Sequence, residues 1–161
     1  MAILGRFSGG VAPTTVSGIW AAVTGIGTTT DRNDGSAYSW NSGTGVMTLP
    51  SSNLADGYLV IARTRFQDSS NGRANPQLRW IQSSGTGDFV SQWGSGYVRN
   101  NNNNDAYITS WGFVHNASAN AELTLQWQID TDAITINDTE AYIDIIPLFY
   151  QNTLVGFQGR S

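Results

Sequence analysis

The chain contains a single histidine, His115, so any chemistry that needs an imidazole has one available centre. A Ser-His-Asp relay also needs a hydroxyl close to that ring. The nearest one in the sequence, Ser118, lacks the strand-turn-helix context that exposes a nucleophile. A lone histidine at the end of an aromatic-rich run is typical of a packing residue. We therefore expect no catalysis and no histidine-based metal site at His115.

Carboxylates offer the next route to chemistry, because a pair of them can hydrolyse glycosidic bonds. Glu122 and Glu140 are the only glutamates, and both flank runs of strand-forming residues beside turns, which favours a structural role. Asp130 with Asp132, and the stretch 31–35, superficially resemble calcium loops. Neither has the spacing or the terminal glutamate of such a loop. The sequence thus predicts a protein that is not an enzyme and has no cofactor or metal.

Sugar binding is the remaining chemistry that the residue types allow. Trp93, Tyr97 and the asparagine run 100–104 combine aromatic faces with amides, which bind sugars by stacking and hydrogen bonding. We treat Trp93 and Tyr97 as candidate glycan-binding residues, and packing in a core or interface is their alternative role. The sequons at Asn116 and Asn137 are expected by chance in a chain this rich in Asn, Ser and Thr, so they predict no attached glycan.

The composition bounds the partners of the chain. It has 161 residues, 12% of them charged, a net charge of −4, and arginine as its only basic residue apart from histidine. Nucleic acid is disfavoured, because scattered arginines supply no clustered positive field. No stretch approaches the roughly 20 apolar residues of a membrane span. The start of the sequence lacks the charged and apolar segments of a secretory signal, which predicts synthesis in the cytoplasm.

Short apolar runs separated by Gly, Asn, Ser and Thr predict an all-β fold. No window keeps apolar residues at helical spacing over three turns, and the runs are rich in Val, Ile, Tyr, Phe and Trp. About eight strands at this spacing fit a two-sheet antiparallel jelly-roll sandwich. The expected strands are residues 19–24, 46–49, 58–67, 77–82, 89–93, 107–115, 122–130 and 141–148.

Some of these strands carry apolar residues on both faces, which predicts a contact between subunits. The strand 122–130 alternates apolar and polar residues, as a strand with one wet face does. The strands 58–66, 107–115 and 141–148 do not, so their second face needs a cover, and another copy of the chain is the simplest one. The residues expected in this contact are Leu59, Ile61, Trp111, Phe113, Ile143 and Ile145.

The order of these segments resembles the jelly roll of tumour necrosis factor and of the globular heads of complement. The similar parts are Leu49-Pro50, the strand from Tyr58, the strand 106–114, the alanine-rich turn before Glu122, and the strand from Ala141 to Leu148. In that family the strands corresponding to 58–66, 107–115 and 141–148 form a three-fold interface. The resemblance therefore implies a homotrimer.

Small, cysteine-free members with Asn-, Gly- and Ser-rich loops most resemble tailed-bacteriophage virion proteins. This resemblance implies a capsid cement or decoration protein that binds the major capsid protein on the virion surface. The alternative is a receptor- or glycan-binding head of a phage fibre. We expect a jelly roll over residues 19–148, flanked by arms at 1–18 and 149–161. In the first arm, Ile3, Leu4, Arg6 and Phe7 are candidates for anchoring the capsid.

Overall fold

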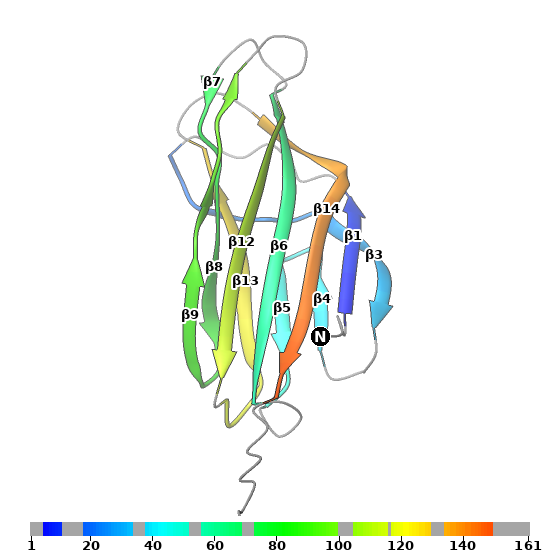
Figure 1. Cartoon of the computed structure of the whole chain (residues 1–161), viewed down its shortest axis with the longest axis vertical. Coiled ribbons are helices and arrows are strands. Elements are labelled where there is room, and N and C mark those ends of the chain that lie inside the picture. Colours follow the sequence, from blue (N-terminus) through cyan, green and yellow to red (C-terminus); the bar gives the residue numbers. More distant parts are fainter. Residues whose placement is uncertain are drawn as a thin grey trace, which may run out of the picture.

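The protein is an all-β sandwich in the computed structural model, which describes residues 5–10, 18–33, 38–51, 56–68, 73–99, 105–115, 117–129 and 134–149. Two antiparallel sheets of six strands each lie face to face, and Figure 1 looks onto one of them with the other behind. The expected fold class is therefore confirmed. A third, two-stranded sheet joins β7 (Arg73–Ala74) and β11 (Val98–Arg99).

The first sheet has the strand order β3-β1-β14-β6-β12-β9. Two of its central strands, β6 and β12, are paired over their whole shared length, from Asp105 opposite Gln67 to His115 opposite Gly57. The strands of this sheet are β1 (Gly5–Gly10), β3 (Ile26–Asn33), β6 (Gly57–Asp68), β9 (Asp88–Gln92), β12 (Asp105–His115) and β14 (Ile134–Leu148).

The second sheet has the order β10-β8-β13-β5-β4, and the short β2 pairs with β13 beyond the end of β5. The chain passes from the first sheet to the second at Trp93, between β9 and β10. The strands of the second sheet are β2 (Ala21–Ala22), β4 (Ser39–Asn41), β5 (Val46–Leu49), β8 (Gln77–Ser84), β10 (Gly94–Ser95) and β13 (Ala121–Gln128).

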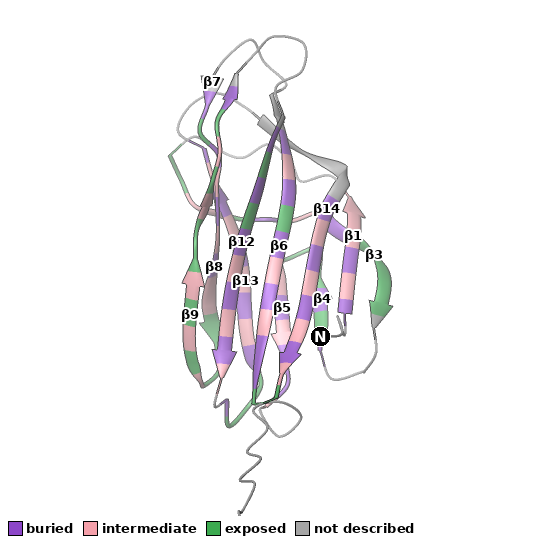
Figure 2. Cartoon of the chain, in the orientation of Figure 1, coloured by how far each residue is buried: buried purple, intermediate pink, exposed green. Residues whose placement is uncertain are grey.

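The core lies between the two sheets and is built from alternate residues of their strands. Along β12, along β6 from Tyr58 onward and along β14 from Ala141 onward, buried residues alternate with half-buried or exposed ones wherever burial is described (Figure 2). Two aromatic pairs lie in the core. Trp40 and Trp80, both of the second sheet, have ring centroids 6.1 Å apart, and Phe66 of the first sheet meets Trp127 of the second at 5.9 Å. The indole of Trp40 donates a hydrogen bond to the carbonyl of Ile26 at 2.8 Å, so this buried polar group is satisfied.

The expected N-terminal arm is wrong over its described part, because residues 5–10 are a strand of the first sheet. β1 lies between β14 and β3, with Arg6 opposite Asp144 and Phe7 opposite Ile143. Phe7 is only 4% exposed and belongs to the core. Residues 1–4, with Ile3 and Leu4, lie outside the described residues, as do residues 150–161 of the expected C-terminal arm.

The strands expected from the sequence are found, with shifted ends in most cases. β5 has the expected bounds, while β6, β8, β12 and β14 run further than expected. The strand expected at 19–24 shrinks to the two residues of β2. Strands β1, β3, β4, β7, β10 and β11 were not expected. Most are two or three residues long, and periodicity cannot be seen over so short a run.

Candidate functional site

The outward side of the first sheet carries a row of apolar side chains across four strands. Val90 of β9 lies opposite Phe113 of β12, Phe113 opposite Leu59 of β6, and Leu59 opposite Ile146 of β14. Directly opposite residues of an antiparallel pair share a face and have Cβ atoms about 5 Å apart. Their chain neighbours on these strands point inward and fill the core, so this row is the opposite, outer surface of the sheet.

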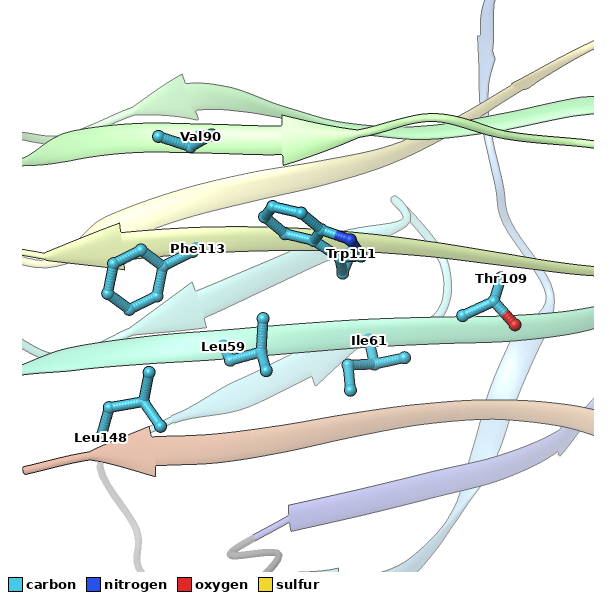
Figure 3. A pocket seen from close by; sticks show the side chains of 7 residues that line it. All are labelled: Leu59, Ile61, Val90, Thr109, Trp111, Phe113 and Leu148. Atoms are coloured by element: carbon cyan, nitrogen blue, oxygen red, sulfur yellow. The ribbon is translucent and has the colours of Figure 1, made fainter.

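Further apolar residues widen this row into a surface with a shallow hollow of about 550 Å³. Trp111 lies opposite Ile61 in the adjacent row, and Leu148 lies one pleat beyond Ile146. Figure 3 shows the side chains that line the hollow gathered on one side of β9, β12, β6 and β14: Leu59, Ile61, Val90, Thr109, Trp111, Phe113 and Leu148. We call this surface the apolar face. Its members are Leu59, Ile61, Val90, Trp111, Phe113, Ile146 and Leu148.

A glycine shapes one end of the apolar face. Gly57 lies opposite both His115 and Leu148, and a Cβ atom built on it would lie 2.7 Å from Cε2 of Phe113. The missing side chain lets the Phe113 ring lean over the end of β6. His115 stacks on Phe113 with 5.4 Å between ring centroids. His115 thus takes part in packing at the edge of the apolar face, consistent with its expected role.

Charged and aromatic side chains occupy the other end of the same surface. The guanidinium of Arg6 donates to both carboxylate oxygens of Asp144, at 2.6 Å from Nε and 2.7 Å from Nη2. These hydrogen bonds raise the pKa of Arg6 above its usual value. Arg6 also lies over the ring of Tyr142 at 5.4 Å, and Arg63 lies over Tyr107 at 5.3 Å. The outer surface of the first sheet therefore changes from apolar to ionic along its strands.

The structure brings together four of the six residues expected at a subunit contact and separates the other two. Leu59, Ile61, Trp111 and Phe113 all belong to the apolar face. The placement of Ile143 and Ile145 on that face is wrong, because both are fully buried between the sheets, opposite Ala62 and Val60. The residues of β14 that face outward are Tyr142, Asp144, Ile146 and Leu148.

The error for β14 arises because both faces of that strand carry isoleucine. The signal that identifies the outer face is Asp144, which shares the outward parity with Ile146 and Leu148 and could not be buried without a partner. Val90, Ile146 and Leu148 were also missed. Val90 is 53% exposed and stands on an edge strand whose pattern is too short to assign a face.

The two candidate sugar-binding residues are exposed, and no ring contact joins them within the described residues. Trp93 is 54% and Tyr97 52% exposed, yet the ring partner of Trp93 is Trp20, at 5.1 Å and an interplanar angle of 65°. Tyr97 makes no ring contact with Trp93 in the described part of the chain. The guanidinium of Arg79 lies 3.9 Å from the centroid of Trp20 and 5.2 Å from that of Trp93. Trp20 and Arg79 were not expected here.

The remaining candidate groups have ordinary partners or lie outside the described residues. The Ser118 hydroxyl lies 2.9 Å from that of Thr86, and the His115 ring lies 3.7 Å from a carboxylate oxygen of Asp88. Glu122 stands on β13 between Ser84 and Thr48. Asp31 is an exposed residue of β3. The side chains of Asp34, Asn116, Asp130, Asp132, Asn137 and Glu140, and the asparagine run, are not among those described.

Comparisons with known proteins leave the site to be argued from its own geometry. No protein-family model matches the chain, and no curated protein sequence matches it. Within the described ranges, no three His, Asp or Glu side chains are grouped closely enough to hold a metal ion. The same residues include no helix with the length and apolar character needed to cross a membrane.

Proposed function

We propose that the chain is a structural protein of a virus particle, a homotrimer that stabilises a phage head by binding its surface. The observation that carries the proposal is the apolar row Val90–Phe113–Leu59–Ile146. This row faces outward, and no described strand covers it. The hollow is lined by Thr109 and by every member of the apolar face except Ile146, and none of these side chains carries a charge. Burying such a surface away from water is favourable by about 25 cal/mol per Å² of apolar area.

A second copy of the same chain is the occupant that fits this face best. In a closed ring of three copies, each contact joins two different parts of the same surface, and uncharged parts can meet without repulsion between like charges. A stable contact buries roughly 800 Å² per partner, so the contact must extend beyond the hollow. The exposed side chain of Tyr107 lies on the same side of β12 and would be covered by this larger contact.

The number three and the capsid role come from the resemblance stated above. In the tumour necrosis factor-like jelly roll, the strands corresponding to β6, β12 and β14 surround a three-fold axis. The observed strand order places these three side by side, β14-β6-β12, in the middle of the first sheet. A protein of this kind works by adding contacts across a shell, and it needs no reactive group.

Labelling of purified virus particles tests the capsid role. Gold-labelled antibody against the chain, viewed by electron microscopy of particles from its source, is expected to decorate the head at regular positions. Particles that lack the protein should lose their contents at lower temperature than complete ones. Label confined to the tips of fibres, or particles without any label, would contradict the proposal.

A further inference from the structure

The outer surface of the second sheet carries a cluster of side chains that the assembly proposal does not use. It consists of Trp20, Arg79, Trp93 and Gln126, which we call the Trp-Arg cluster. Arg79 of β8 lies opposite Gln126 of β13, Trp20 directly precedes β2, and Trp93 lies between β9 and β10. Residues from four segments of the chain therefore meet at one point of the surface.

Arg79 is held in a fixed position by this cluster. Its Nε and Nη2 atoms donate hydrogen bonds to Oε1 of Gln126 at 3.0 and 2.8 Å, and its guanidinium plane lies against Trp20. A guanidinium has five N–H donors, so these two bonds leave three for another partner. An arginine fixed in this way loses little further freedom when it binds a ligand.

The charge of Arg79 is not matched by a carboxylate in the described part of the chain. Its partners there are an amide and two aromatic rings, whereas Arg6 on the first sheet is paired with Asp144. Burial lowers the pKa of Arg79, and no anion among the described residues opposes this effect. A partly desolvated cation without a counter-ion attracts an anionic group more strongly than a hydrated one.

Trp93 supplies an apolar surface next to this cation. Its ring meets Trp20 edge to face and remains 54% exposed. Pyranose rings present a face of C–H groups that packs on an indole, while their polar substituents bond to nearby donors. A ring stacked on Trp93 would place its substituents near the guanidinium of Arg79, which is 5.2 Å from the indole centroid.

We infer that the Trp-Arg cluster binds an acidic sugar, a pyranose ring stacked on Trp93 whose carboxylate is bound by Arg79. A neutral sugar would use the indole but leave the guanidinium without an anion, so the site should prefer the acid. The cluster lies on the sheet opposite to the apolar face. Binding is therefore independent of the proposed trimer.

Ligand-observed saturation-transfer NMR with the full-length protein tests this inference. The probes are the methyl glycosides of N-acetylneuraminic acid and glucuronic acid, with methyl glucoside as the neutral match and acetate as the carboxylate alone. We expect both acidic sugars to bind at least tenfold more tightly than methyl glucoside and acetate. Equal binding of acetate and the acidic sugars, or no binding of either sugar at millimolar concentration, would overturn the inference.

Variants assign the binding to the cluster. Trp93→Ala should weaken the acidic sugars at least tenfold, and Arg79→Gln should remove the preference for acid over neutral sugar. Arg79→Lys keeps the charge and should retain part of that preference, which separates loss of the cation from loss of packing. Tyr97→Ala is the matched control, because Tyr97 is equally exposed but outside the cluster. Unchanged binding by Trp93→Ala would place the sugar elsewhere and contradict the assignment.

Discussion

Replacing Phe113 or Leu59 by aspartate is expected to convert the proposed trimer into folded monomers. Both side chains lie at the centre of the apolar face, so each copy would bring an unpaired carboxylate into a contact that excludes water, at a cost of several kcal/mol. In the separate chain both side chains lie half-buried on the outer side of the sheet. Their replacement should therefore lower the free energy of unfolding of the monomer by only about 1 to 2 kcal/mol. Sedimentation velocity gives the mass, and circular dichroism gives the fold.

Ile145→Asp is the contrasting variant, because this residue belongs to the same sheet but points into the core. Ile145 is fully buried opposite Val60, so the carboxylate would cost more than about 4 kcal/mol and unfold the chain. Gln128→Asp on the outer side of β13 is the control that should keep both mass and fold. A Phe113→Asp protein that sediments like the wild type would show that the apolar face is not the contact.

Removing residues 1–10 is expected to prevent folding rather than to release an arm. The deletion takes away β1, which is hydrogen-bonded on both edges, and it removes the buried Phe7. β14 and β3 would then lose their common neighbour. The loss should exceed about 5 kcal/mol, comparable to the entire stability of many domains. The soluble yield and the thermal melting of the truncated chain measure it.

Two single substitutions in β1 provide graded controls for this truncation. Phe7→Ala opens a cavity in the core and should cost about 3 to 5 kcal/mol. Arg6→Gln removes a half-exposed ion pair with Asp144 and should cost about 1 kcal/mol or less. A truncated protein that melts cooperatively near the wild-type temperature would mean that β1 is dispensable for folding. It would then support the expectation that the N-terminal segment is an arm.

The sequence predicts strands best where one face is wet. β13 alternates Leu123, Leu125 and Trp127 with polar residues, and its inward face was assigned correctly for that reason. β14 carries isoleucine on both faces, so hydrophobicity alone could not say which face is buried. β1, with the sequence GRFSGG, has little strand propensity of its own. Pairing with β14 and β3, which are distant in sequence, makes it a strand.

The candidate sites follow the same division between local and long-range information. The pairing of Leu59 and Ile61 with Phe113 and Trp111 could be anticipated, because both strands repeat an apolar residue at every second position. The meeting of Trp20, Arg79 and Trp93 could not, because it depends on where the chain passes from one sheet to the other and on how β2 docks beside β13. Neither feature has a periodicity in the sequence.

The mass of the wild-type protein in solution tests the central claim most directly. The chain has a mass of 17.4 kDa, and sedimentation equilibrium at micromolar concentration is expected to give three times this value. Self-association through the apolar face predicts that this mass persists at physiological salt, since the burial of uncharged side chains is not screened. A single species of 17.4 kDa over the micromolar range would contradict the account.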